Sequence, residues 1–200
     1  MKLIGMMDSP YVRRTAISLA LYGISFDSLK LSVFSDYQEF SGFNPAVKAP
    51  TLLTDDGVRL VDSSLILQYF ETLAGAEKKL LPTAPAALAR DTEIIGTILM
   101  AAEKTVQYVY EYRLRPEEKQ YQPWVERVTG QLLQACRLWE SQIAGHVPSD
   151  NPDQVAVTGT VVWSFIQLMI PQVVMKSEFP VLQAIAEHYE AQPVFLRFPQ

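Results

Sequence analysis

Two short polar motifs stand where the sequence predicts that a helix begins. Ser9 precedes Pro10 and an amphipathic stretch, and Asp62-Ser63 precedes another such stretch. Ser and Asp are favoured helix caps, and proline suits the first helical position because it has no N–H to leave unpaired. The N-terminus of a helix also favours negative charge. Each motif therefore serves as a cap or as a site for an anion, and for Ser9 the residue by itself favours the cap.

The other reactive residue types do not form a known catalytic or metal-binding pattern. Cys136 is the single cysteine, which excludes an internal disulfide, and together with only two histidines it argues against a zinc site. Cys136 lies in a helical stretch, where a buried structural thiol is the favoured interpretation. The sequence also lacks the Gly-x-Ser-x-Gly motif of hydrolases and a glycine-rich phosphate loop. Because the chain has one cysteine and two histidines, we expect no metal site.

The composition is that of a globular protein. Of 200 residues, 48% are hydrophobic and 20% charged, and the net charge is −5. With no basic run, the chain is expected to bind neither nucleic acid nor a membrane surface. No signal peptide is evident, so the cytoplasm is the expected compartment. Residues 155–175 are uncharged over about the length of a membrane span, but their polar side chains favour a helix at the centre of a helical domain.

The first part of the chain alternates predicted strands and helices. Apolar runs at 2–6 and 26–31 flank an amphipathic helix that Gly23 is expected to end, and this β-α-β order favours a parallel strand pair. Asp55-Asp56-Gly57 lies between two further apolar runs and predicts a hairpin. A helix from 65 to about 74 follows. We therefore place an α/β domain at residues 1–76.

Helical periodicity dominates the rest of the chain. Residues 77–85 contain two prolines and are predicted to be a linker, which leaves residues 86–200 as an all-helical domain. The predicted helices of that domain cover residues 86–113, 117–144, 155–170 and 179–191.

Three motifs in this order resemble those of the cytosolic glutathione S-transferases, in particular the bacterial ones. The first is residues 9–14, Ser-Pro-Tyr-Val-Arg-Arg. The second, residues 44–52, is similar to the family's N-P-x-G-x-V-P-x-L, and the third is Asp62-Ser63. A softer likeness continues at 115–120 and 123–124. The resemblance implies the glutathione transferase fold: an α/β thioredoxin-like N-terminal domain plus an all-α helical C-terminal domain.

The resemblance implies that Ser9 is catalytic. Glutathione reacts as a thiolate, and lowering the pKa of its thiol from about 8.5 by about two units requires roughly 2.7 kcal/mol. A hydrogen bond from the Ser9 hydroxyl and the N-terminus of a helix are sufficient for this. Tyr11 is the rival hydroxyl, although lining or packing at the pocket suits it better. Arg13 adds positive potential to the pocket or, on the safer interpretation, lies exposed on the first helical turn.

The resemblance also implies where glutathione binds. The Ala49–Pro50 bond is cis in the family, and it would aim the backbone N–H and C=O of Ala49 at the cysteinyl backbone of glutathione. Lys48 would reach the glycyl carboxylate. Ser63 would bind the γ-glutamyl carboxylate and Asp62 the ammonium group, a role that is compatible with capping the helix.

The function expected from this resemblance is conjugation of glutathione, as co-substrate, to a small apolar electrophile. A glutathione-dependent isomerase or dehalogenase, and a non-catalytic glutathione-binding or scaffold protein, remain alternatives. A glutaredoxin-like activity is disfavoured because Ser9 stands where the attacking cysteine would be. The resemblance further implies a homodimer, for which Ile94, Ile98 and Leu99 offer apolar positions.

The sequence departs from the family pattern at three places. Val47 replaces the usual glycine of the second motif. The family's Ser/Thr-x-x-Asp helix cap has no clear counterpart around 155–161, which leaves the start of that helix open. No aspartate stands at Gly96 or Met100, where related bacterial chains often carry one.

Overall fold

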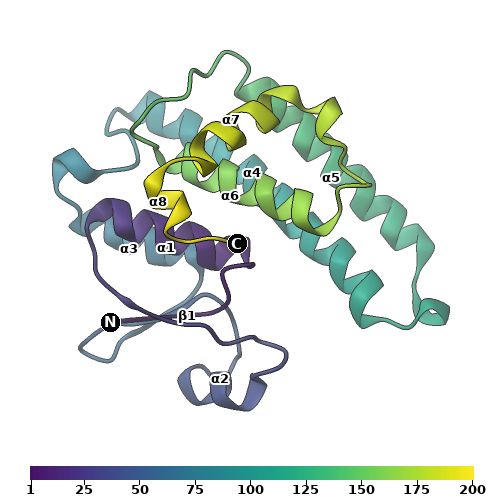
Figure 1. Cartoon of the computed structure of the whole chain (residues 1–200), viewed down its shortest axis with the longest axis horizontal. Coiled ribbons are helices and arrows are strands. Elements are labelled where there is room, and N and C mark those ends of the chain that lie inside the picture. Colours follow the sequence, from purple (N-terminus) through teal and green to yellow (C-terminus); the bar gives the residue numbers. More distant parts are fainter. The chain divides into compact units, whose positions relative to one another are not determined.

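The computed structural model describes all of residues 1–200, which form two compact units. Residues 1–81 and 191–200 make up the first unit, and residues 82–190 make up the second (Figure 1). The first contains all the strands, and the second is helical. This architecture agrees with the fold class expected from the sequence.

A four-stranded mixed sheet forms the base of the first unit, with the order β2-β1-β3-β4. The strands are β1 (Lys2–Ile4), β2 (Asp27–Leu29), β3 (Thr51–Leu53) and β4 (Arg59–Leu60). The β1–β2 pair is parallel, as predicted, and the other two pairs are antiparallel. Ile4 is in register with Thr51. The segment that follows β1 therefore lies beside the segment that precedes β3.

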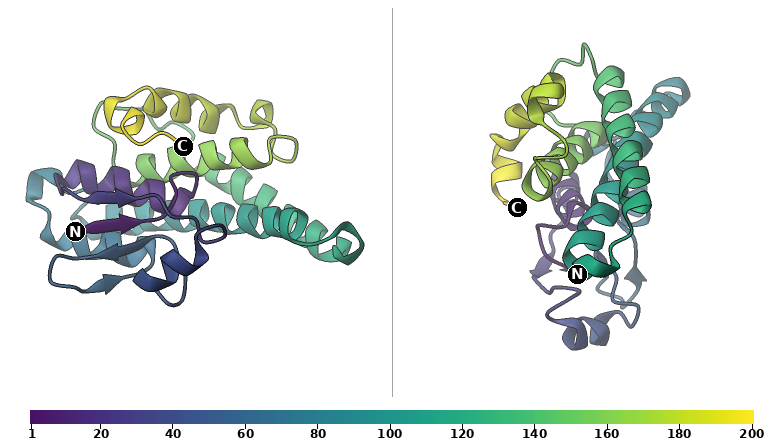
Figure 2. Two further views of the ribbon diagram at one scale, coloured as in Figure 1. Left: turned by 60° about the horizontal axis from the view of Figure 1, so that its bottom comes forward. Right: turned by 90° about the vertical axis from the view of Figure 1, so that its right-hand side faces the viewer.

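The helices of the first unit are α1 (Pro10–Tyr22), α2 (Tyr37–Phe43), α3 (Ser63–Leu73) and the short α8 (Pro193–Leu196), with a 3-10 turn at Ala76–Lys78. α1 and α3 pack together on one side of the sheet, and α2 lies on the other side (Figure 1, Figure 2). α1 starts after Ser9 and ends at Gly23, whose φ of 78° is left-handed, as predicted. Fully buried side chains join sheet and helices, among them Leu3, Ile4, Val12, Ile17, Leu52 and Ile66.

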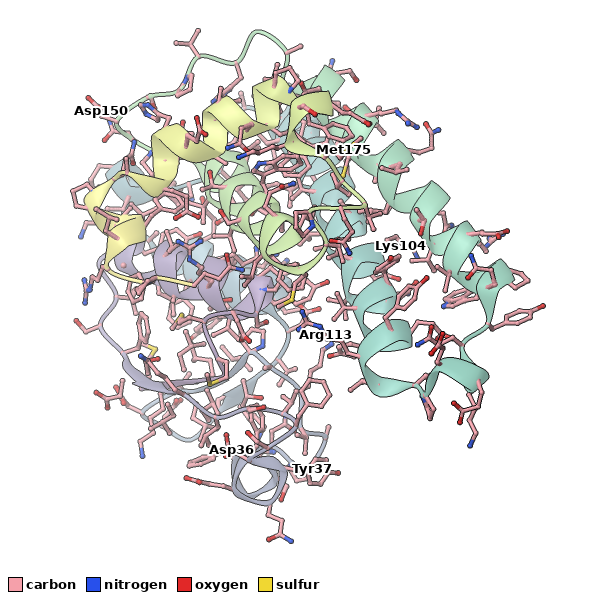
Figure 3. The ribbon with its side chains drawn as sticks, turned by 45° about the vertical axis from the view of Figure 1, so that its right-hand side comes forward. Asp36, Tyr37, Lys104, Arg113, Asp150 and Met175 are labelled. Carbon is pink, nitrogen blue, oxygen red and sulfur yellow. The ribbon has the colours of Figure 1, made fainter.

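The second unit consists of α4 (Pro85–Leu114), α5 (Gln122–Gln142), α6 (Gln154–Met169) and α7 (Pro180–Glu190), with 3-10 turns at Glu117–Lys119 and Lys176–Glu178. α4 packs against α5 and α6, and α7 packs against α6. The second half of α4 carries Lys104 and Arg113 (Figure 3). The helix predicted from residue 117 was wrong at its start, because a separate 3-10 turn precedes α5. No helix has the length and apolar character needed to cross a membrane.

α6 is the buried centre of the helical unit, as its uncharged sequence predicted. It starts at Asp153, whose side chain accepts a hydrogen bond of 2.7 Å from the N–H of Ala156. This aspartate supplies the cap that the family motif left unassigned. Ile98 of α4 packs close to Gly159 on α6. Ile94 and Ile98 are both buried, so the prediction that they are available to a second copy was wrong.

Candidate functional site

Gly5 allows the loop after β1 to meet both α1 and the segment before β3. Its φ is +142°, and a Cβ at this position would lie 2.5 Å from Cγ2 of Val12 and 3.1 Å from Cβ of Ala49. A side chain here would therefore collide with the first turn of α1 and press on Ala49. The two motifs that contain Ser9 and Ala49 are brought together at this glycine.

Ser9 is the N-cap of α1 and is partly exposed. Its Oγ accepts from the N–H of Val12 at 3.5 Å, which is long for a hydrogen bond. Because the hydroxyl oxygen only accepts in this bond, its proton remains available for a second partner. Ser9 thus places a hydroxyl donor at the N-terminus of a 13-residue helix, where negative charge is favoured.

Asn44 organises the loop that leads to Ala49. The side chain is buried; its Nδ2 donates to Oγ1 of Thr51 at 2.8 Å, and its Oδ1 accepts from the N–H of Ala46 at 3.0 Å. The hydroxyl of Thr51 in turn donates to the carbonyl oxygen of Lys48 at 2.6 Å. These bonds link both ends of the second motif. They explain why the motif requires Asn44.

The Ala49–Pro50 peptide bond is cis in this structure, and so is the Val61–Asp62 bond. Pro50 is buried and Ala49 is partly exposed at the start of β3. Lys48 is exposed beside them. The backbone of Ala49 and the side chain of Lys48 are therefore accessible to a ligand that binds beside the loop before β3.

Val47 lies in a backbone conformation that glycine adopts more easily. Its φ is +47°, which is left-handed and rare for a β-branched residue. This conformation lowers the stability of the folded state by roughly 1–2 kcal/mol for an L-residue. A glycine lowers it by about 0.4–1 kcal/mol for a different reason, because it gives the unfolded chain more conformational freedom. The glycine that the family carries here avoids the steric cost.

Replacing Val47 with glycine is expected to raise the free energy of unfolding by up to about 1 kcal/mol, the balance of these two effects. Urea unfolding measures this. Val47→Thr is the matched control, because threonine is also β-branched and keeps the strain. A glycine variant less stable than the threonine variant would contradict the assignment.

Asp62 caps α3. Its Oδ1 accepts from the N–H groups of Ser64 at 2.9 Å and Leu65 at 3.2 Å. Both bonds use Oδ1, so Oδ2 of this exposed side chain is available to a ligand. Ser63, by contrast, is only 2% exposed. The capping role predicted for Asp62 is confirmed, and two of the N–H groups at this helix end are already occupied.

Arg14 joins α1 to the start of α3. Its Nη1 donates to Oγ of Ser63 at 3.2 Å and to Oγ of Ser64 at 3.3 Å. Burial lowers the pKa of Arg14 to about 10, and the Asp62 carboxylate opposes that change, so the guanidinium stays charged at neutral pH. The sequence placed Arg14 in the first motif without a role. No local signal distinguishes it from an exposed arginine of a first helical turn.

Arg13 has a different place from the one predicted. Its side chain is buried, and its Nε donates to the carbonyl oxygen of Phe198 at 2.7 Å. The interpretation of Arg13 as an exposed residue was therefore wrong, because the end of the chain returns to cover it. Tyr11, on the same turn, is partly buried.

Cys136 belongs to the second unit. It lies in α5 of the helical unit and is fully buried. Burial raises the pKa of its thiol to about 12, so the reactive thiolate is absent at neutral pH. No group of three or more His, Cys, Asp or Glu side chains is placed to hold a metal ion.

Residues 3–78 match the model of the glutathione S-transferase N-terminal domain. The uncharacterized GST-like protein YibF of Escherichia coli is 36% identical over 91 residues, a match that covers 46% of this chain and 41% of that protein. The matched segment thus spans less than half of the length of this relative.

Two solved structures share the fold over nearly the whole chain. A glutathione S-transferase from Methylobacterium radiotolerans, in complex with glutathione sulfonate, has a TM-score of 0.88 at 23% identity, covering 98% of this chain and 93% of that one. A maleylacetoacetate isomerase from Methylobacterium extorquens, with bound malonate and glutathione, has a TM-score of 0.76 at 21% identity, covering 98% and 95%. At these identities the likeness establishes the fold alone.

Proposed function

We propose that the chain, whose residues 3–78 match the glutathione S-transferase N-terminal domain, is a member of that family, binds glutathione on its N-terminal unit and transfers it to a small apolar electrophile. The observation that carries the proposal is the convergence of three motifs on α1. Gly5 brings Ala49 to the turn that holds Ser9, and Arg14 connects the same helix to Ser63.

In this proposal Ser9 stabilises the sulfur of glutathione as a thiolate. The free hydroxyl proton donates to the sulfur, and the N-terminus of α1 adds its partial positive charge. The thiolate then attacks the electrophilic carbon and forms the carbon–sulfur bond. It either expels the leaving group with its electron pair or adds to a double bond whose other carbon takes up a proton from solvent. Tyr11 remains the second candidate for the activating hydroxyl.

The rest of glutathione extends along the same unit. The backbone of Ala49, beside Pro50, pairs with the cysteinyl residue, and Lys48 reaches the glycyl carboxylate. Oδ2 of Asp62 accepts from the γ-glutamyl ammonium, and the start of α3 at Ser63 receives the γ-glutamyl carboxylate. Each group of the tripeptide thus meets a complementary one.

Titration of the wild-type protein with glutathione in a calorimeter tests the binding part of the proposal, and saturable binding below millimolar concentration is expected. Turnover with a panel of apolar electrophiles tests the transferase part. Glutathione-dependent isomerisation is the second candidate function, since the fold is shared with an isomerase. Binding without turnover in either assay would favour the non-catalytic alternative, and no binding at millimolar glutathione would refute the proposal.

We further propose that the protein is a homodimer. α3 exposes Leu65, Tyr69 and Leu73, which recur every four residues and so form one apolar strip. Light scattering at micromolar concentration is expected to give twice the monomer mass of 22.5 kDa. Tyr69→Glu should shift the population towards the monomer, whereas Leu168→Glu, an exposed site on α6, should not. A monomer mass for the wild type would contradict this proposal.

A further inference from the structure

Arg14 is a buried cation that contacts hydroxyl groups instead of a carboxylate. Its side chain is 2% exposed, and Nη1 donates only to the hydroxyl oxygens of Ser63 and Ser64. Its Nε is buried and has no hydrogen-bond partner. Asp62 favours the charged form of Arg14, but Oδ1 of Asp62 is engaged by the N–H groups at the start of α3. Buried charges in proteins are normally paired and hydrogen-bonded, yet no carboxylate makes a hydrogen bond to Arg14.

The two hydroxyl groups are oriented by Arg14. A serine oxygen that accepts from Nη1 keeps its own proton for another acceptor, so both O–H groups point away from the guanidinium as donors. Ser63 and Ser64 are the first two residues of α3, an 11-residue helix. The dipole of such a terminus adds positive potential. Two directed donors, a helix terminus and a cation behind them are suited to a carboxylate.

We propose that Arg14 is the positioning residue for the γ-glutamyl carboxylate of glutathione, and that it acts through the hydroxyls of Ser63 and Ser64. The inference rests on the proposed glutathione binding. It adds Ser64, which is exposed, to the ligand groups. The γ-glutamyl end carries a carboxylate and an ammonium on one carbon, so Asp62 binds the cation while the Arg14–serine group binds the anion. The charge of Arg14 thereby reaches a ligand that its side chain does not touch.

The test compares glutathione with 4-aminobutyryl-cysteinylglycine, which lacks only that carboxylate. Both ligands are titrated into the wild type, Arg14→Met and Arg14→Lys. Arg14→Met is expected to weaken glutathione binding about tenfold to a hundredfold, since charge-assisted donors lose their orientation, and to change binding of the analogue less than about twofold. Arg14→Lys keeps the charge and is expected to restore part of the glutathione affinity.

Tyr22→Phe is the matched control. Tyr22 also lies on α1 and also bonds to α3, because its hydroxyl donates to Oε2 of Glu71 at 2.8 Å. Removing this bond is expected to leave the affinities for both ligands unchanged. If the substitutions only loosened the packing of α1 against α3, the affinity for both ligands would fall in Tyr22→Phe and in Arg14→Met alike.

The outcomes separate the inference from the proposed function. Equal loss of both ligands in Arg14→Met would overturn the inference and leave glutathione binding intact as a property of the wild type. No discrimination between the ligands by the wild type would also overturn it. Absence of wild-type binding to glutathione would refute the proposed function and the inference together. Should Arg14→Met fail to fold, Ser64→Ala and Arg14→Lys decide: each is expected to lose part of the wild type's preference for glutathione over the analogue, and an unchanged preference in both would overturn the inference.

Discussion

Replacing Ser9 with alanine is expected to lower turnover at neutral pH about tenfold to a hundredfold, because a charge-assisted hydrogen bond to the thiolate is worth roughly 1.5–3 kcal/mol. Glutathione affinity should change little, since Ser9 meets only the sulfur. The pKa of bound glutathione should rise towards the value of the free thiol, about 8.5. The pH–rate profile should therefore move to higher pH, and alkaline conditions should partly rescue the variant.

Ser9→Gly separates the catalytic role from capping. Glycine is a tolerated N-cap that costs only a few tenths of a kcal/mol, whereas alanine costs about 1 kcal/mol. If Ser9 stabilises the thiolate, the two variants should be equally slow although they differ in stability. An unchanged rate and pH profile in both would leave Ser9 as a cap, and Tyr11→Phe would then be the next variant.

Ser9→Cys is the third member of this series. A thiol at a helix N-terminus ionises readily. Conjugation should weaken, and a mixed disulfide with glutathione should form in the presence of an oxidised glutathione pool, with a mass increase of one glutathionyl group. Mass spectrometry detects it. The buried Cys136 thiol should stay unmodified, which makes it an internal reference.

Removing both Asp62 and Ser63 side chains should abolish most of the glutathione affinity. The double variant Asp62→Ala, Ser63→Ala loses the counter-charge of the ammonium and one hydroxyl of the carboxylate site. Two such contacts, one of them charged, are together worth about 3 kcal/mol, a loss of more than about a hundredfold in the dissociation constant. Calorimetry with glutathione measures this.

Asp62→Asn is the matched variant for the charge. Asparagine caps a helix as well as aspartate does, so the bonds to the N–H groups of Ser64 and Leu65 should persist. The free energy of unfolding should then stay within about 0.5 kcal/mol of the wild type, while glutathione binding weakens about tenfold. Unchanged affinity in Asp62→Asn would show that Asp62 acts only as a cap.

The sequence predicted the elements whose signals are local. Ser9 with Pro10, Gly23, Asp55-Asp56-Gly57 and Asp62 mark ends and turns that the structure contains, because caps, proline and Asp-Gly act on the backbone within a few residues. The uncharged run of α6 likewise predicted a buried helix. The three motifs predicted the α/β unit and the helical region.

Only the tertiary structure shows which side chains lie at the candidate site and which are buried in other contacts. Arg13 and Arg14 are adjacent, yet one meets the carbonyl of Phe198, 185 residues away, and the other meets Ser63. Likewise the Glu140 carboxylate accepts from the N–H groups of Val181 and Leu182 and so caps α7 from another helix. Such partners are fixed by packing between distant segments, which no local pattern encodes. For the same reason, the sequence did not predict that Ile98 packs against α6 or that Arg14 contacts Ser63.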